Sequence, residues 1–205
     1  FYQKHYAPNR ATIVIVGDVD PAETLQKIQT RYGNLARKEV TERTVIADAI
    51  PTAPKFKQLS LNVQVEKLVM VYPIPPMDHT DWPALDLLNF VLSRGKSARL
   101  KRALVDTQIA TDIDAAPVNL RDPGIFSIEA TMQNKASAKT AEAIILRELE
   151  RLRSGKVLPA ELERAKNQFQ FMVMESLGTN SRRARTLGEW ETTYGDYRKG
   201  LSHFE

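Results

Sequence analysis

Apolar residues in the first part of the chain follow a strand pattern and then a helix pattern. Residues 11–17 form an almost continuous β-branched run that closes on a glycine, which is typical of a buried strand. Asp20 can then cap a helix, Pro21 suits its first position, and apolar residues at helical spacing continue as far as Gly33. We therefore expect a strand over residues 11–17 and an amphipathic helix over residues 21–33.

Residues 38–55 break this pattern. They carry charged residues and two prolines, and their apolar positions follow neither the helical nor the strand period. Such a stretch is typical of a connector. We therefore expect a domain boundary within residues 38–55.

Strand patterns return after the connector. Apolar residues alternate over residues 58–65 and again over residues 68–73, which end at a proline-rich turn. A further alternation over residues 126–132 predicts a strand with one face in water, and residues 109–118 are expected to pair with it.

Helix patterns lie between and after these strands. Apolar residues share one helical face over residues 81–93, Gly95 interrupts the pattern, and a shorter helix is expected over residues 97–105. The last third is helical, with patterns over residues 141–152, 159–173 and 181–190. Strands gathered early and helices gathered late indicate an α+β fold, in which helices cover one face of an antiparallel-rich sheet.

The composition fits a soluble globular protein of one large domain, or of one domain with a piece of its neighbour. Of the 205 residues, 42% are hydrophobic and 26% are charged, which argues against a disordered chain. No run approaches the roughly 18 uninterrupted apolar residues of a membrane span, so we expect no such span. The first residues are not signal-like, and the bacterial periplasm and the cytoplasm both suit the chain.

The net charge of +4 does not favour nucleic acid as a partner. Lys and Arg are spread along the chain, and 25 acidic residues nearly match 29 basic ones. Two denser basic clusters are interpreted as solvated helix faces: Arg94, Lys96, Arg99, Lys101 and Arg102, and then Arg182, Arg183 and Arg185.

The chain offers few residues for metal or thiol chemistry. It has no cysteine and three histidines, His5, His79 and His203. Zinc hydrolases need closely spaced His and carboxylate ligands, so that three groups converge and leave a position for water. None of these histidines belongs to a His-x-x-Glu-His motif or to its inverse, so we expect neither a metal site nor a catalytic residue here.

The segment Gly95-Lys96-Ser97 looks like the end of a phosphate-binding loop. That motif needs a glycine five residues before its Gly-Lys-Ser and a strand leading into it. Phe90 stands at that position, and the preceding segment has a helical pattern. Ser97 also lacks the glycine-flanked turn and the histidine partner of a nucleophilic serine. Neither nucleotide binding nor serine catalysis is indicated.

Three segments of the chain, in this order, carry a family resemblance. They are Phe1-Tyr2-x-x-His5-Tyr6-Ala7-Pro8-Asn9-Arg10 running on to Asp20-Pro21, then Gly95-Lys96-Ser97-Ala98-Arg99-Leu100, then Pro159-Ala160-Glu161-Leu162-Glu163-Arg164-Ala165-Lys166. The first resembles the segment that follows the zinc-binding half of pitrilysin/insulinase-type zinc peptidases, relatives of mitochondrial processing peptidase. The other two are similar to the second, inactive domain of that family.

The resemblance implies a parent protein with two related α+β domains, whose zinc is held in the first domain by a His-x-x-Glu-His motif and a later Glu. Residues 1–37 would be the closing strand and helix of that preceding zinc-binding domain, and residues 38–55 the connector. Residues 56–205 would form the second, non-catalytic domain, truncated at its C-terminus. Zinc would be a cofactor of the parent and not of this segment.

The resemblance also implies that the second domain closes a chamber over an extended peptide substrate. Gly95, Ser97 and Arg99, in the matching turn, would contact that peptide. Some family members grip the substrate backbone with an Arg and a Tyr after this turn, but the matching positions here hold Val105 and Thr111. A second family subunit would then supply the missing pair. The alternative is a scaffold or assembly subunit without peptidase activity.

Overall fold

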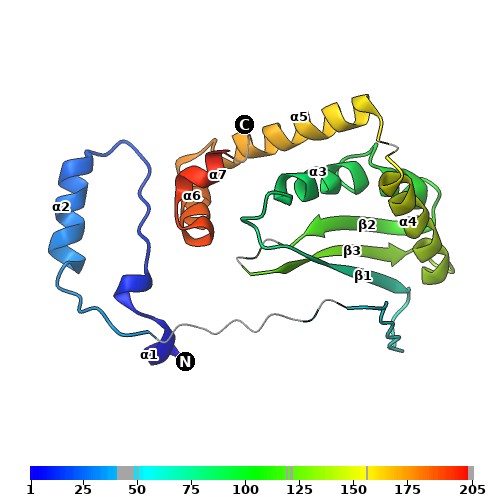
Figure 1. Cartoon of the computed structure of the whole chain (residues 1–205), viewed down its shortest axis with the longest axis horizontal. Helices are drawn as coiled ribbons and strands as arrows, with labels where there is room; N and C mark the ends of the chain where they lie inside the picture. The colour runs from blue at the N-terminus through cyan, green and yellow to red at the C-terminus, as the bar shows by residue number, and fades with distance from the viewer. Residues whose placement is uncertain (41–48, 50, 119, 121, 156, 203–205) are drawn as a thin grey trace. The chain divides into compact units, whose positions relative to one another are not determined.

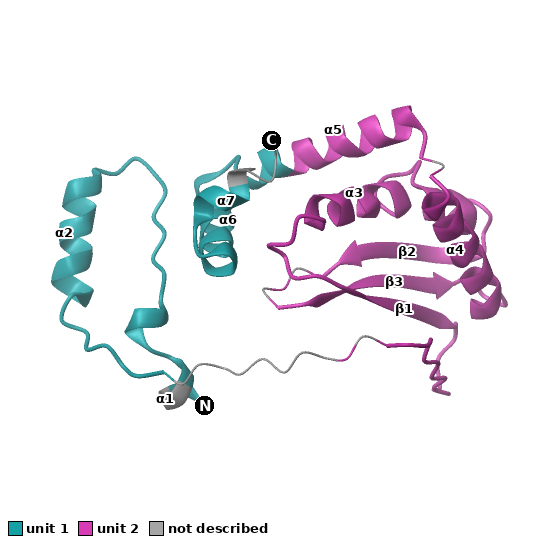
Figure 2. Cartoon of the chain, in the orientation of Figure 1, with its two compact units in different colours: residues 1–46, 173–205 teal, residues 47–172 magenta. Residues whose placement is uncertain are grey.

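The computed structural model describes residues 1–40, 49, 51–118, 120, 122–155 and 157–202 of the chain (Figure 1). The chain divides into two compact units, residues 47–172 and residues 1–46 with 173–205 (Figure 2). The larger unit holds a three-stranded sheet, and the smaller unit holds helices and extended chain.

The larger unit is built on an antiparallel sheet in the order β1-β3-β2. Its strands are β1 Lys67–Ile74, β2 Ala110–Pro117 and β3 Gly124–Met132. Ile128 of the central strand is paired with Met70 of β1 and with Ala115 of β2. Buried and more exposed positions alternate along β3, which confirms the predicted strand with one face in water.

Helices cover one face of this sheet and form the main core with it (Figure 1). They are α3 Trp82–Leu92, the π-helical turn η2 Lys101–Val105 and α4 Ala138–Arg153. The side chains that meet there are almost fully buried and include Trp82, Leu92, Leu104, Ile113, Ile128 and Ile145. Each such burial contributes about 1.5–3 kcal/mol, so this layer stabilises the unit. The predicted α+β fold is confirmed.

A second, smaller core fixes the start of α5 Pro159–Ser176. Ala165 is buried together with Phe90 and Val91 of α3. The rings of Phe90 and Phe169 meet edge to face, with 5.9 Å between their centroids, a favoured aromatic geometry. The part of α5 that belongs to the larger unit therefore packs on α3.

The smaller unit is mainly helical in its described part. It contains α1 Tyr2–His5, η1 Pro8–Arg10, α2 Pro21–Tyr32, α6 Asn180–Tyr194 and α7 Tyr197–Ser202. Asp20 caps α2 as predicted, because its carboxylate accepts a hydrogen bond of 2.7 Å from the Glu23 N–H. Within the described residues, no helix has the length and apolar character needed to cross a lipid bilayer.

Two segments with predicted strand character are extended chain in the structure. Residues 11–17 and 58–65 belong to no sheet within the described part of the chain, so these two predictions of strands are wrong. Most of their large apolar side chains are exposed, with Ile13 at 53% and Leu61 at 72%. A strand is stable when a neighbour takes up its N–H and C=O groups. The apolar pattern therefore shows that these residues favour an extended strand. Whether the strand joins a sheet depends also on a neighbouring segment.

Candidate functional site

The candidate site is centred on the turn that follows α3. Gly95 has a φ of 85°, in the left-handed region, which confirms the predicted break between two helical segments. A Cβ added at this position would lie 3.1 Å from the Nε2 atom of Gln168. Both the backbone conformation and the close approach of α5 therefore favour glycine here.

Ser93, at the end of α3, fixes this turn to the sheet. Its side chain is buried. The hydroxyl donates a hydrogen bond of 3.2 Å to the carbonyl of Ala115, and it accepts one of 2.9 Å from the N–H of the same residue. The end of α3 is thus held to β2 by a pair of hydrogen bonds.

Arg99 leaves the turn and forms a bidentate ion pair with Glu161 at the start of α5. Its Nε donates to Oε1 at 2.7 Å and its Nη2 donates to Oε2 at 2.5 Å. The two side chains are 14% and 11% exposed, so this pair is largely shielded from water. Ser97, by contrast, is exposed. The interpretation of the first basic cluster as a solvated helix face is therefore wrong for Arg99.

The ion pair shifts the proton affinity of both partners. The hydrogen bond from Arg99 holds the pKa of the Glu161 carboxyl below its ordinary value, although burial opposes this shift. The same hydrogen bond raises the pKa of Arg99, and the negative charges of Glu161 and Glu148 act in the same direction. Both groups therefore stay charged at neutral pH.

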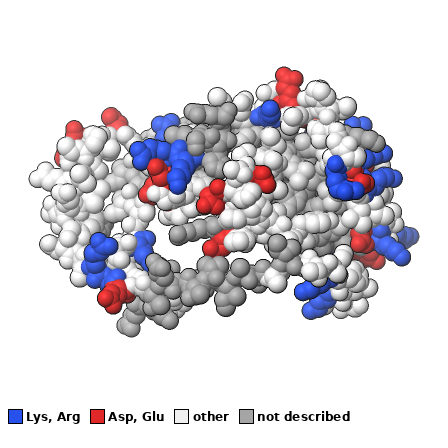
Figure 3. Space-filling model, viewed as in Figure 1, with Lys and Arg blue, Asp and Glu red and all other residues white. Residues whose placement is uncertain are grey.

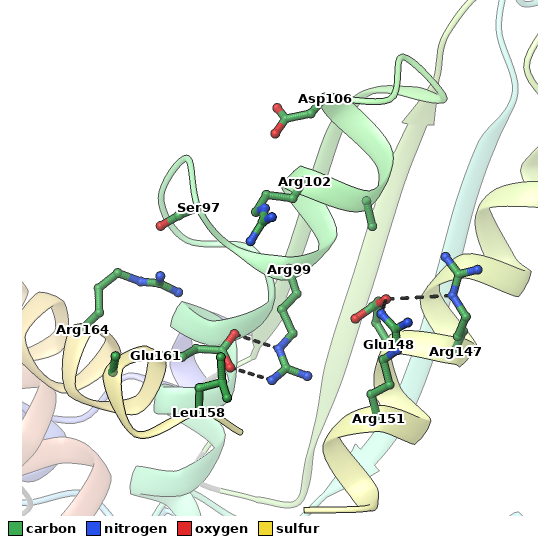
Figure 4. A pocket seen from close by; sticks show the side chains of 12 residues that line it. Ser97, Arg99, Arg102, Asp106, Arg147, Glu148, Arg151, Leu158, Glu161 and Arg164 are labelled. Atoms are coloured by element: carbon green, nitrogen blue, oxygen red, sulfur yellow. Dashed lines mark hydrogen bonds and ion pairs between the residues drawn. The ribbon is translucent and has the colours of Figure 1, made fainter. Parts of the chain in front are cut away.

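A groove of about 820 Å³ opens beside this ion pair, between η2, α4 and the start of α5 (Figure 4). We call it the arginine groove. Its lining consists of Ser97, Arg99, Arg102, Ala103, Asp106, Arg147, Glu148, Arg151, Leu158, Ala160, Glu161 and Arg164. Five guanidinium groups face three carboxylates, so the lining carries an excess of two positive charges. Figure 3 shows how Lys, Arg, Asp and Glu are distributed on one face of the molecule.

Glu148 neutralises part of this charge. Its side chain is 7% exposed, and its Oε1 lies 2.7 Å from Nη1 of Arg151 and 3.9 Å from Nε of Arg147. The sequence alone did not single out Glu148 or Arg151. Their only signal was the spacing of three residues on a predicted helix, which brings opposite charges together.

The two positions that match the family's Arg and Tyr hold residues that contact the core and the sheet backbone of this chain. Val105 packs against the main core, and the hydroxyl of Thr111 donates a hydrogen bond of 3.2 Å to the carbonyl of Thr131. The ladder between β2 and β3 is irregular between Ala110 and Asp112. Neither side chain can provide the positive charge or the phenol of the family pair.

The two histidines that the structure describes belong to no metal-binding cluster. The ring of His5 lies against that of Phe1 in the smaller unit, with 4.7 Å between ring centroids and a tilt of 41° between their planes. His79 lies in the turn before α3, where its Nδ1 accepts a hydrogen bond of 3.2 Å from the Asp81 N–H. His203 lies outside the described residues. Within residues that the structure does describe, no group of three or more His, Cys, Asp or Glu side chains could hold a metal ion. These residues do not fit a catalytic zinc.

Comparisons with known proteins agree on one family. The family profile described as "Peptidase M16 inactive domain" matches residues 1–169. The chain is 27% identical over 190 residues to "Zinc protease PqqE" of Helicobacter pylori, covering 88% of this chain and 42% of that protein. It is 21% identical over 206 residues to the "Probable mitochondrial-processing peptidase subunit beta, mitochondrial" of Arabidopsis thaliana, covering 95% of this chain and 38% of that protein. The chain thus spans less than half the length of these two relatives.

The fold is also found among solved structures. The crystal structure of a protease from Helicobacter pylori superposes with a TM-score of 0.77 at 24% identity, covering 92% of this chain and 46% of that one. At 24% identity, this structural similarity is evidence for the fold of the chain.

Proposed function

Because the chain belongs to the peptidase M16 inactive-domain family, we propose that it is the non-catalytic, substrate-binding part of a zinc metalloendopeptidase. The match of residues 1–169 to the family carries this proposal, and the similarity to a protein named a zinc protease supports it. The parent protein acts on peptides or unfolded polypeptides. Its zinc and its catalytic residues lie in a preceding domain, upstream of this segment.

In this proposal the three parts of the chain have different roles. Residues 1–37 complete the preceding zinc-binding domain, residues 38–55 connect the domains, and residues 56–205 form part of the second domain. The second domain closes a chamber over an extended peptide. The exposed apolar positions in residues 11–17 and 58–65 support this division, because they suit strands that pair only within the longer parent.

Gly95, Ser97 and Arg99 form the wall that the peptide contacts. Gly95 keeps the turn compact, and the exposed hydroxyl of Ser97 is available to a peptide. Arg99 holds the wall in position through its bidentate pair with Glu161. A wall anchored in this way is preorganised, which lowers the conformational cost of binding an extended chain.

A second subunit of the same family completes the site by supplying the Arg and Tyr that Val105 and Thr111 replace. The similarity to a protein named as a subunit of mitochondrial-processing peptidase supports a partner subunit. The same two replacements also favour the alternative, a scaffold or assembly subunit without peptidase activity. Finding a His-x-x-Glu-His motif about 200 residues upstream would decide for the peptidase, and its absence for the scaffold.

A crosslinking experiment tests peptide contact at the wall directly. The chain contains no cysteine, so Ser97→Cys introduces a single thiol that can carry a photoreactive group. We expect this group to crosslink a neutral unfolded peptide of about ten residues, which is long enough to extend across a groove. The matched control is Ser181→Cys at an exposed position of α6, which should give no crosslink. Equal yields at both positions would contradict the proposal.

A further inference from the structure

Two arginines in the arginine groove form no ion pair in the described part of the chain, although the charge of Arg164 also acts on Glu161. Arg99 is paired with Glu161, and Glu148 lies against Arg151 and Arg147. Arg102 and Arg164 remain, and they account for the excess of positive charge. In Figure 4 the side chain of Arg102 is directed toward Arg99, whereas Asp106 is directed away from both.

Arg164 has a hydrogen-bond donor that no described residue satisfies. Its Nη2 atom is buried and has no hydrogen-bond partner among the described residues. A buried donor without an acceptor is unfavourable by about 1–3 kcal/mol, and more when it is charged. Such donors are rare in folded proteins, and an ordered water or a bound ion can satisfy them. Figure 4 shows the Arg164 side chain extending from α5 toward Ser97 on the facing segment.

Arg102 lies on an unusual piece of backbone. It belongs to η2, a π-helical turn over Lys101–Val105. Single π-helical turns are rare and occur frequently at functional sites, because they displace side chains from regular helical positions. Here the displaced turn presents a guanidinium group to the groove. Arg102 and Arg164 therefore reach the same groove from two separate elements.

The chemistry of the groove points to carboxylates. A guanidinium group matches a carboxylate with two parallel hydrogen bonds. The three carboxylates in the lining, Asp106, Glu148 and Glu161, would repel a long phosphate chain, whereas an excess of two charges suits one or two carboxylates. Leu158, Ala103 and Ala160 add apolar surface for the methylene groups of a Glu side chain.

We propose that Arg102 and Arg164 form a specificity site that binds acidic side chains of a peptide substrate in the arginine groove. The inference rests on the proposed peptide-binding function and adds a preference for sequence to it. Ser97, at the edge of the groove, supplies a further hydroxyl donor. The parent peptidase would accordingly favour peptides with Asp or Glu at a fixed distance from the cleaved bond.

Binding of two matched peptides tests this inference on the 205-residue chain. The peptides are neutral apart from two central Glu residues, which are Gln in the second peptide, and fluorescence anisotropy gives the dissociation constants. We expect the Glu peptide to bind about tenfold more tightly, equivalent to about 1.4 kcal/mol. This preference should shrink at high salt, because exposed charges are screened.

Substitutions of the two arginines test whether they cause the preference for the Glu peptide. Arg102→Gln and Arg164→Gln should each remove most of the difference between the peptides, while the affinity for the Gln peptide stays unchanged. The matched control is Arg31→Gln, an exposed arginine of α2 outside the groove, which should keep the full difference. Circular dichroism melting checks that each variant is folded.

The outcomes separate this inference from the function on which it rests. Equal affinities for the two peptides, or a preference that survives in both groove variants, would overturn the specificity site. The crosslink of a neutral peptide at position 97 would still support the proposed function in that case. If no crosslink formed but the Glu preference persisted, the proposed peptide contact at Gly95, Ser97 and Arg99 would be wrong. The proposed specificity site in the arginine groove would still stand.

Discussion

At the scale of single residues, the turn after α3 depends on a position without a side chain. Gly95 combines a φ of 85° with the approach of Gln168. The sequence predicted the turn, because a glycine between two helical patterns is a common helix end. It did not predict the contact with Gln168, which is 73 positions away and can be brought close only by the packing of α5 on α3.

Replacing this glycine should destabilise the larger unit. We expect Gly95→Ala to lower the free energy of unfolding by about 1 kcal/mol or more, since an L-residue is strained at positive φ. Urea denaturation measures the effect. The matched control is Gly155→Ala, where φ is 74° but no atom lies within 4 Å of the added Cβ. The control should show only the backbone strain, and a smaller loss for Gly95→Ala than for Gly155→Ala would contradict this account.

At the scale of elements, the pair of Arg99 and Glu161 fastens the turn before η2 to the first turn of α5. The periodic patterns were sufficient to predict α2, α3, α4, α5 and α6, because apolar residues at helical spacing and capping residues are local signals. They could not reveal a contact between residues 62 positions apart. They also predicted strands over residues 11–17 and 58–65, which are unpaired in the structure. The sequence pattern of a strand does not show whether another segment lies beside it to pair with.

The pH dependence of stability should report this contact. The pKa of Glu161 is lowered in the folded chain from an ordinary value of 4.5, chiefly by its hydrogen bond from Arg99. A carboxyl with a lowered pKa stabilises the fold above pH 4.5 and loses this contribution as the pH falls through the lowered value. Wild type should therefore be more stable than Glu161→Gln at pH 7, and the difference should shrink below pH 4.5.

Chemical denaturation of both chains between pH 7 and pH 3 measures this difference. Glu150→Gln is the matched control, because Glu150 pairs with Arg153 on the exposed surface, where ion pairs contribute little. Its difference from wild type should stay small at every pH. A constant difference between wild type and Glu161→Gln across this range would refute the linkage.

At the scale of the whole molecule, the chain has the fold of an M16 inactive domain, and a zinc site is not expected in it. Catalytic zinc needs about three protein ligands and an open position for water. His5 belongs to the smaller unit and His79 to the larger one, and the sequence has one further histidine and no cysteine. Neither described histidine belongs to a cluster of ligands. In the proposed function, zinc and peptidase chemistry belong to a preceding domain of a longer parent.

The most direct test of this account is the melting temperature of the 205-residue chain in a chelator and in a micromolar excess of zinc. A metal that binds only the folded state raises the melting temperature by mass action. We predict the same melting temperature in both conditions. A higher melting temperature in zinc, with one zinc ion per chain and chelator-sensitive peptide hydrolysis in the same sample, would contradict the account, and His79 would then be the first ligand to examine.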